Sequence, residues 1–506
     1  MSRPHTAQAA AQAATTTTTT APPAAERPRT LWAPSAWLDG RWQDRVLLEI
    51  DSAGRWSALR PDHPCPEGLA PLPGPVLPGL VDAHSHAFQR AFAGLSERRE
   101  GAHDDFWSWR DRMYRVAGAL TPDELHAIAV HLYRELLRGG YTQVCEFHYL
   151  QHRPDGRPYD DPLAFAHALA RAAADTGIGL TLLPVLYERA GFRQPALRPD
   201  QARFRMDAAA VQAACQALAA DGHATLNAGL AVHSLRAATP EGLRQLAAWV
   251  ADGTDGACAG LPLHIHVAEQ TAEVDDCLAA TGQRPLQWLA SQGLLNPRWH
   301  LVHATHVTPA EIAAVAAAGA SAVICPGTEA DLGDGLTDIA GWLDAGVGLS
   351  VGSDSQVTRD WREELRWMDW GQRLGRRQRN VAAAPQAHQG ATAARLFESA
   401  CAAGGRAAGQ ARWGLQRGAR ADLLVIDPQD PALAGVPASH RLDALVFSAP
   451  AGPWQGVMVA GRWVIPCPAA DSRPHTGPGP GPDPAYTRVM ARLWGMPDPP
   501  PGPARA

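Results

Sequence analysis

The chain has 506 residues, of which 46% are hydrophobic and 19% are charged, a composition typical of a globular protein with a large core. Its net charge of −6 is spread along the sequence without a basic stretch. This distribution argues against nucleic acid and against an anionic membrane surface as partners, so we expect a small molecule.

Two residue types narrow the chemistry and the compartment. The sequence contains no lysine, which excludes Schiff-base catalysis, a phosphate-loop lysine and a carbamylated lysine that bridges two metal ions. The eight cysteines are scattered without a Cys-x-x-Cys pair, as in proteins of a reducing compartment. We find neither a signal peptide nor an apolar run of about eighteen residues, and therefore expect a cytoplasmic protein without a membrane span.

Composition divides the chain into a middle, two flanks and two ends. The Ala/Thr-rich residues 1–28 are expected to be a disordered extension, and the Pro/Gly-rich residues 467–506 a partly disordered tail. Residues 29–76 and 405–466 contain short strand-like runs. Because neither flank alone can enclose a core, we expect them to form one small β-sandwich together.

The middle, residues 77–404, alternates between apolar, β-branched runs and Ala/Leu-rich helical patterns. About eight such units predict a (β/α)8 barrel of the α/β class. In this fold the active site is built from residues just past the C-terminal ends of the strands. The expected strands are 77–82, 141–146, 180–186, 226–232, 262–267, 299–303, 321–325 and 347–351, and helical patterns lie at 122–138, 161–175, 208–220, 240–251 and 308–318.

Metal-ligand residue types gather at these strand ends. His84 and His86 end the first strand, and side chains at positions i and i+2 of a strand point to the same side. Three histidines and one aspartate from these strand ends would suit Zn²⁺ as ligands and would also bind Fe²⁺ or Mn²⁺. They would leave one coordination position of the metal open for water. Spacing alone does not distinguish His264 from His266 as a ligand. Further candidates are His264, His266 and Glu269 at strand five, His303 and His306 at strand six, and Asp354 after strand eight.

The order of these residues resembles the amidohydrolase superfamily over most of residues 77–400. Within that superfamily, longer stretches resemble the formimidoylglutamate deiminase family. The sequence departs from that family's pattern at Asp331, where asparagine is expected. The resembling stretches are His84-Ser-His-Ala-Phe-Gln-Arg90, Asp105-Phe-Trp-Ser-Trp-Arg110, Glu146-Phe-His-Tyr149, His303-Ala-Thr-His306 and Thr328-Glu-Ala-Asp-Leu-Gly-Asp-Gly335.

The resemblance implies hydrolytic deimination of N-formimino-L-glutamate to N-formyl-L-glutamate and ammonia, in histidine degradation, by a homodimer. It implies one divalent metal ion, with Zn²⁺ first and Fe²⁺ or Mn²⁺ as alternatives. The planar guanidinium groups of arginines suit the two carboxylates of such a dianionic substrate. The implied metal ligands are His84, His86, His266 and Asp354; the implied catalytic residues are Glu269, His303 and Asp354; and the implied substrate-binding residues are Gln89, Arg110, Tyr149, His233 and Arg236.

Two other functions remain open from the sequence. The first is an amidohydrolase-type deaminase of a purine, pyrimidine or related ring, which Trp107 and Trp109 would suit as aromatic walls. The second is a barrel that has lost catalysis and serves as a scaffold. A ring deaminase would not need the arginines, whereas a dianion in a partly dry pocket would, because an unpaired buried charge is costly.

Overall fold

The computed structural model describes residues 30–99, 104–223, 225–252, 258, 260–448, 450, 452–467 and 483–497. The extension expected at 1–28 lies outside the described residues, and so does most of the tail expected at 467–506. Among the described helices, none combines the length and the apolar character needed to cross a bilayer.

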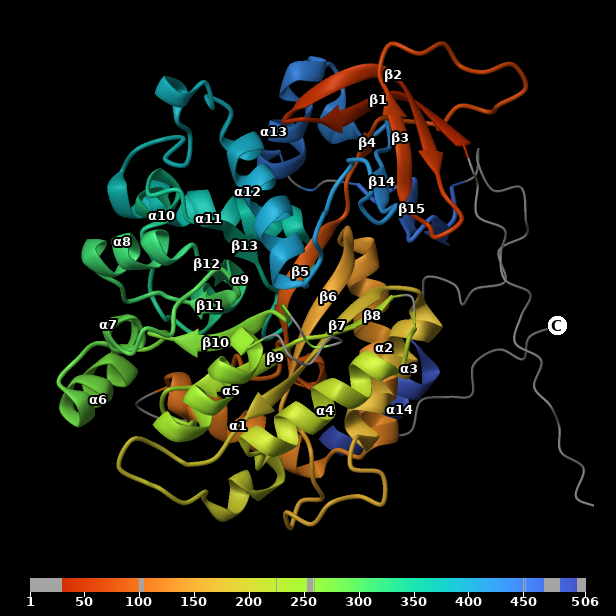
Figure 1. Cartoon of the computed structure of the whole chain (residues 1–506). Coiled ribbons are helices and arrows are strands. Elements are labelled where there is room, and N and C mark those ends of the chain that lie inside the picture. The colour runs from red at the N-terminus through yellow and green to blue at the C-terminus, as the bar shows by residue number, and fades with distance from the viewer. Residues whose placement is uncertain are drawn as a thin grey trace, which may run out of the picture.

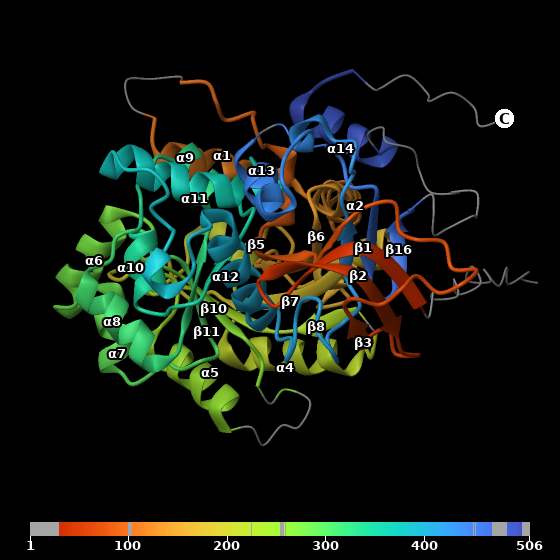
Figure 2. The ribbon, with the colours of Figure 1, turned by 90° about the horizontal axis from the view of Figure 1, so that it is seen from above.

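Eight parallel strands form a nearly closed barrel, which confirms the expected fold class (Figures 1 and 2). A parallel bridge between Ser85 and Asp354 joins the first and last strand ends. The strand residues are almost all buried, as parallel strands covered on both faces must be. In barrel order the strands are β5 (Leu80–Ser85), β6 (Tyr141–His148), β7 (Gly179–Leu186), β9 (Leu230–Ser234), β10 (Leu263–Val267), β11 (Trp299–His303), β12 (Ser321–Ile324) and β13 (Leu349–Val351), and the short β8 (Leu226–Ala228) also pairs with β7.

Helices follow the strands and cover the outside of the barrel (Figure 2). The expected helix at 122–138 is observed as α2 (Pro122–Arg138), which begins with a reciprocal capping box between Thr121 and Glu124. The other helices of the barrel are α3 (Ala164–Thr176), α4 (Ala208–Ala220), α5 (Pro240–Asp252), α6 (Thr271–Thr281), α7 (Pro285–Ser291), α8 (Pro309–Ala318), α10 (Ile339–Asp344), α11 (Trp361–Arg376) and α12 (Thr392–Ala407).

Helices in the loops after the strands lie around the mouth of the barrel. They are η1 (Ala87–Ala91), α1 (Phe106–Ala119), η2 (Pro199–Phe204) and α9 (Pro326–Asp331). The remaining short elements are η3 (Pro385–Ala387), η4 (Pro431–Leu433), η5 (Ala438–His440) and α13 (Arg441–Phe447).

Both flanks contribute to one accessory sheet, which lies beside the barrel (Figure 1). Its strands form a single hydrogen-bonded sheet, and residues from both flanks share one small core that includes Val46, Trp56 and Leu423. The strand expected at 77–82 is divided: Val76–Leu77 joins this sheet, and β5 begins after Pro78, which has no N–H for a ladder. In sheet order the strands are β16 (Arg462–Ile465), β15 (Gly456–Val459), β14 (Leu423–Val425), β4 (Val76–Leu77), β1 (Thr30–Leu38), β2 (Arg41–Ile50) and β3 (Trp56–Arg60).

The described part of the tail contains a helix that the sequence did not lead us to expect. This helix, α14 (Pro484–Trp494), begins after Asp483, whose side chain accepts a hydrogen bond from the backbone N–H of Ala485. It packs against α2, and Figures 1 and 2 both show the two helices side by side.

Candidate metal centre and substrate cavity

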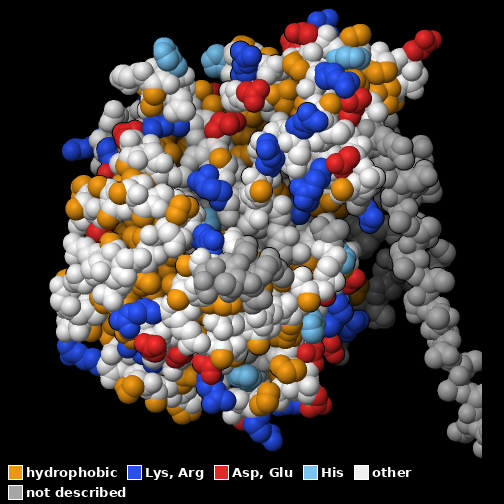
Figure 3. Space-filling view, viewed as in Figure 1, with side chains coloured by type: hydrophobic (Ala, Val, Ile, Leu, Met, Phe, Trp, Pro, Cys, Tyr) orange, Lys and Arg blue, Asp and Glu red, His pale blue; other side chains and the backbone are white. Residues whose placement is uncertain are grey.

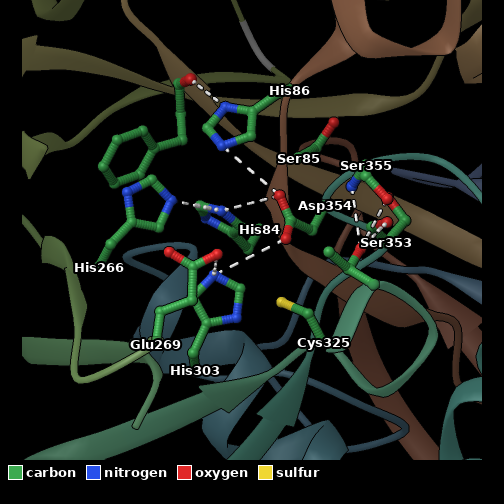
Figure 4. A network of polar contacts seen from close by, with 12 residues as sticks. His84, Ser85, His86, His266, Glu269, His303, Cys325, Ser353, Asp354 and Ser355 are labelled. Atoms are coloured by element: carbon green, nitrogen blue, oxygen red, sulfur yellow. Dashed lines mark hydrogen bonds and ion pairs between the residues drawn. The ribbon is translucent and has the colours of Figure 1, made fainter. Parts of the chain in front are cut away.

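A cluster of histidines and one aspartate lies at the C-terminal ends of the barrel strands (Figure 4). His84 and His86 come from the end of β5 and His266 from β10, while Asp354 follows β13. The Nε2 atoms of His84 and His266 are 3.0 Å apart, and Asp354 Oδ1 lies 3.4 Å from His84 Nε2 and 3.5 Å from His86 Nε2. The four predicted ligands therefore converge on one point.

Hydrogen bonds to the outer ring nitrogens orient two of these imidazoles. His86 Nδ1 lies 2.8 Å from the carbonyl oxygen of Phe147, and His266 Nδ1 lies 2.8 Å from that of His233. A carbonyl only accepts, so each Nδ1 carries the proton and each Nε2 presents a lone pair to the cluster. Lone pairs and a carboxylate at this distance repel one another unless a cation lies between them, so the residues fit a divalent metal ion.

The protonation states agree with ligand chemistry. Burial lowers the pKa of His84 to about 3 and also lowers the pKa values of His86 and His266, so the three imidazoles are neutral at neutral pH. Burial alone would raise the pKa of Asp354, but its hydrogen bond to His84 and the positive charge of His303 hold it below its usual range. Neutral imidazole and ionised carboxylate are the forms that bind metal ions.

Backbone strain marks the same place. His303 and Asp354 have φ values of 68° and 46°, in the left-handed region that residues with a Cβ rarely adopt. Such conformations cost free energy and persist where surrounding structure holds them, commonly at functional sites. Here they turn both side chains into the barrel mouth as the strands end.

The predicted acid/base residues, Glu269 and His303, lie together beside the cluster formed by His84, His86, His266 and Asp354. His303 Nε2 lies 3.7 Å from Glu269 Oε1 and 3.7 Å from Asp354 Oδ2 (Figure 4). Burial raises the pKa of Glu269, and the positive charges of His303 and Arg236 only partly offset this. Arg236 reaches toward the same carboxylate, with Nη2 3.7 Å from Glu269 Oε2.

Glu329 lies behind His303, and the sequence analysis assigned it no role although it belongs to the family-like stretch 328–335. Its Oε1 is 3.4 Å from His303 Nδ1 and accepts a hydrogen bond from the backbone N–H of Cys325 at 3.0 Å. Burial alone would lower the pKa of His303, but the carboxylates of Glu269, Glu329 and Asp354 outweigh it and raise that pKa to about 10.

A cavity of about 440 Å³ opens above this cluster. It is lined by His86, His266, Glu269, His303 and Asp354, and also by each predicted substrate-binding residue: Gln89, Arg110, Tyr149, His233 and Arg236. The structure thus brings together residues that lie far apart in the sequence.

Arg110 stands in the cavity wall without a carboxylate partner among the described residues. Its buried Nε has no hydrogen-bond acceptor, and its guanidinium lies 4.5 Å from the ring centroid of Trp107 and 5.5 Å from that of Tyr114. Stacking on aromatic faces orients a guanidinium without neutralising it. Arg110 is therefore available to an anion in the cavity.

The other wall residues surround the metal-type cluster. The Tyr149 ring packs 5.1 Å from the ring of His86 and 5.6 Å from that of His233, centroid to centroid. Gln89 is 2% exposed, and its Oε1 has no hydrogen-bond donor among the described residues. A buried amide oxygen without a donor is costly, so it is a candidate to receive a hydrogen bond from a bound molecule.

His264 lies outside the cluster, although spacing alone left it open as a ligand. Its Nε2 lies 2.9 Å from the carbonyl oxygen of Ala407, and its ring packs 4.8 Å from that of His300. Residues i and i+2 of a strand share a face but differ in depth by about 6.6 Å. This depth places His264 deeper in the barrel and His266 at the mouth.

Several cavity residues were missed by the sequence analysis. Tyr114, Tyr187 and Gln201 form a hydrogen-bonded group in the wall, and Arg193 and Arg198 lie on the loop after β7. Tyr114 lies on α1 and the other four on the segment after β7, and tertiary packing brings them together at the cavity. Asp331, the departure from the family pattern, ends α9 and does not line the cavity.

A family model described as the amidohydrolase family matches residues 76–464. The chain belongs to the amidohydrolase family. The match spans the barrel, with its cluster of histidines and Asp354, and the accessory strands β4, β14, β15 and most of β16, while β1, β2 and β3 precede it.

Among individual proteins, this amidohydrolase is 46% identical over 440 residues to formimidoylglutamate deiminase of Pseudomonas aeruginosa, an alignment that covers 86% of this chain and 94% of that protein. It is 28% identical over 326 residues to 8-oxoguanine deaminase of the same species, with coverages of 63% and 67%. The solved structure of an amidohydrolase from Brucella melitensis has a TM-score of 0.81 and 35% identity, covering 92% of this chain and all of that one.

Proposed function

We propose that this amidohydrolase hydrolyses N-formimino-L-glutamate to N-formyl-L-glutamate and ammonia. The observation that carries the proposal is the cavity itself, in which the cluster of histidines and Asp354 and an acid/base pair face an arginine that forms no ion pair among the described residues. The 46% identity to a formimidoylglutamate deiminase over most of both chains supports the same substrate.

His84, His86, His266 and Asp354 would hold one divalent ion, because their lone pairs and carboxylate converge there. When bound, such an ion supplies Lewis-acid chemistry that lowers the pKa of water toward roughly 7. We propose Zn²⁺, and Fe²⁺ and Mn²⁺ accept the same ligands.

The residues around His303 Nε2 would carry out the proton transfers of the reaction. Water adds to the imino carbon, and the bond from that carbon to the terminal nitrogen breaks once this nitrogen is protonated. Asp354 is placed to accept the proton of water, because the raised pKa of the neighbouring His303 keeps that imidazole protonated, and Glu269 is placed to deliver a proton to the departing nitrogen. Burial raises the pKa of the Glu269 carboxyl, which helps it to hold a proton until the bond breaks.

The carboxylates of the substrate require cations in the cavity. Arg110 offers a guanidinium group that forms no ion pair among the described residues. Arg236 offers a second guanidinium group, whose Nη2 lies 3.7 Å from Glu269 Oε2 and 4.0 Å from Glu273 Oε2. Bidentate contact with a carboxylate fits the planar guanidinium. A dianion would therefore satisfy Arg110 and compete for Arg236.

The same contacts weigh against a ring deaminase. Trp107, one of the two tryptophans that such an enzyme would use as aromatic walls together with Trp109, already contacts the Arg110 guanidinium. A neutral nucleobase would leave the Arg110 guanidinium without an anionic partner in the half-buried cavity wall. The scaffold alternative is disfavoured because the predicted ligands and catalytic residues converge.

Three finer assignments accompany the proposal: a place in histidine degradation, a cytoplasmic location and a homodimeric state. The first follows from the proposed substrate, and the second from the scattered cysteines. The surface in Figure 3 intermixes acidic and basic side chains, in keeping with a small-molecule partner.

The test is ammonia release by the metal-loaded protein from N-formimino-L-glutamate, N-formimino-L-aspartate, guanine, cytosine and adenosine. We expect turnover of N-formimino-L-glutamate and a modest preference for it over the aspartate analogue, because one methylene is worth only about 1–3 kcal/mol. Release of ammonia from guanine, cytosine or adenosine, without release from N-formimino-L-glutamate, would refute the proposal. Less than about half an equivalent of bound divalent ion, without turnover of any substrate, would support the scaffold.

A further inference from the structure

Arg90 ends the family-like stretch 84–90, yet its side chain points away from the cavity. It follows Gln89 in η1, and successive side chains of a 3₁₀ helix point about 120° apart. Gln89 therefore faces the cavity while Arg90 faces outward to α2 and α14. Whatever fixes the Arg90 side chain also fixes the turn that presents Gln89.

Each arm of the Arg90 guanidinium has a partner. Nε and Nη2 donate to the two carboxylate oxygens of Glu135 at 2.7 and 3.1 Å, and Nη1 donates to the hydroxyl oxygen of Tyr486 at 2.9 Å. Glu135 also pairs with Arg359, 3.3 Å away, in the loop that follows Asp354. We call Arg90, Glu135, Arg359 and Tyr486 the Arg90 cluster.

Helix α14 reaches the elements around the cavity at several points besides Tyr486. Trp494 Nε1 donates to the carbonyl oxygen of Ala91, the last residue of η1, at 2.9 Å. Arg492 donates to the carbonyl oxygen of Ala119 at the end of α1, the helix that carries Arg110. Asp483 pairs with Arg134 of α2 at 2.6 Å, and the Tyr486 ring stacks on His131 of α2 at 4.0 Å.

The ligand His86, by contrast, is held from the other side. Its Nδ1 donates to the carbonyl oxygen of Phe147, and the next backbone N–H, that of Ala87, donates to Glu146 at 2.6 Å. A disturbance at the Arg90 end of η1 therefore reaches Gln89 before it reaches the metal ligands.

We propose that α14 is a positioning element of the substrate cavity: Tyr486 and Trp494 hold η1 so that Gln89 faces the substrate. The helix lies beyond residues 76–464 that match the family model. Tyr486 and Trp494 are positioning residues, because they act through Arg90 and the η1 backbone.

The test uses full-length, metal-loaded protein with Tyr486→Phe, Trp494→Phe and the double substitution. Each single substitution keeps an aromatic ring: Tyr486→Phe removes the two contacts of the hydroxyl with Arg90, and Trp494→Phe removes the hydrogen bond to Ala91. Arg488→Gln is the matched control, because Arg488 is exposed on the same helix. We expect faster amide exchange of the backbone N–H groups of 89–93 in the variants and wild-type exchange in the control.

The kinetic arm rests on the proposed function. We expect the double variant to raise KM for N-formimino-L-glutamate about fivefold, with kcat and metal content within about twofold of wild type, as for loss of a positioned hydrogen bond. Unchanged exchange at 89–93 and unchanged KM, even with a lower melting temperature, would overturn the positioning role. If wild type fails to turn over this substrate, the proposed function fails, while amide exchange still decides the role of α14. The single variants answer the same question if the double variant does not fold.

Discussion

His84 and His266 bring their Nε2 atoms to 3.0 Å from each other in the interior of the protein. The His266 Nδ1 proton is engaged by the carbonyl oxygen of His233, and burial keeps both rings neutral. His266 Nε2 is therefore a buried acceptor, and His84 Nε2 lies between it and the Asp354 carboxylate. A shared cation gives the arrangement its physical reason.

His266→Ala should abolish stoichiometric metal binding, because it removes one of four converging ligands. We expect less than about 0.1 equivalent of zinc by elemental analysis after dialysis against free metal. His264→Gln, two residues earlier on β10, is the matched control and should retain the metal. Normal metal content in His266→Ala, or loss only in the His264 variant, would show that the wrong histidine is assigned.

Glu269→Gln should keep the metal and lose turnover. The amide has nearly the same shape but cannot deliver a proton, and general acid/base groups contribute about 10²–10⁴-fold to rates. We therefore expect kcat to fall at least about a hundredfold at unchanged metal content. Asp275→Asn, an exposed change on α6, serves as control. Wild-type kcat in Glu269→Gln would remove this residue from the mechanism.

Arg110→Met should weaken substrate binding more than chemistry, because the lost group contacts the carboxylates and not the reacting carbon. A rise in KM of about tenfold or more, with a smaller change in kcat, is expected from steady-state kinetics. Arg115→Met, exposed on the same helix, should behave as wild type. An equal loss of kcat at unchanged KM would contradict a binding role for Arg110.

Glu146 predicts a specific pH dependence of stability. Burial raises its pKa from 4.5 to about 8, although hydrogen bonds from Ala87 and Ser85 oppose the shift. The folded state then binds more protons than the unfolded state between about pH 5 and 8, so the free energy of unfolding falls as pH rises through that range. Glu146→Gln removes this titration.

Urea unfolding of wild type and Glu146→Gln at pH 5 to 8 checks the sign. The variant should gain stability relative to wild type as pH rises, and the difference should level off above about pH 8. A difference that stays constant with pH, or that shrinks as pH rises, would be inconsistent with a raised pKa.

The alternation of strand side chains placed His84 and His86 together, because period 2 is a local property of the chain. It did not separate His264 from His266, since these residues share a face and differ in depth, and depth depends on the whole barrel. The resemblance selected His266, and the structure places it with the other predicted ligands.

Glu329, Arg198 and the helix α14 escaped sequence reasoning for a different reason. Glu329 contacts His303 across two strand ends, and Tyr486 contacts Arg90 across 396 positions of sequence. Such pairs carry no periodicity or spacing signal. The fold class, in contrast, follows from strand and helix periodicities that repeat along the chain.

The most direct test of the account is hydrolysis of N-formimino-L-glutamate by metal-loaded protein in H₂¹⁸O, with the products identified by mass spectrometry. We predict ammonia and N-formyl-L-glutamate in equal amounts, with one ¹⁸O in the formyl group, because water adds to the imino carbon and the terminal nitrogen leaves. Formation of glutamate and formamide, or of unlabelled N-formyl-L-glutamate, would contradict the account.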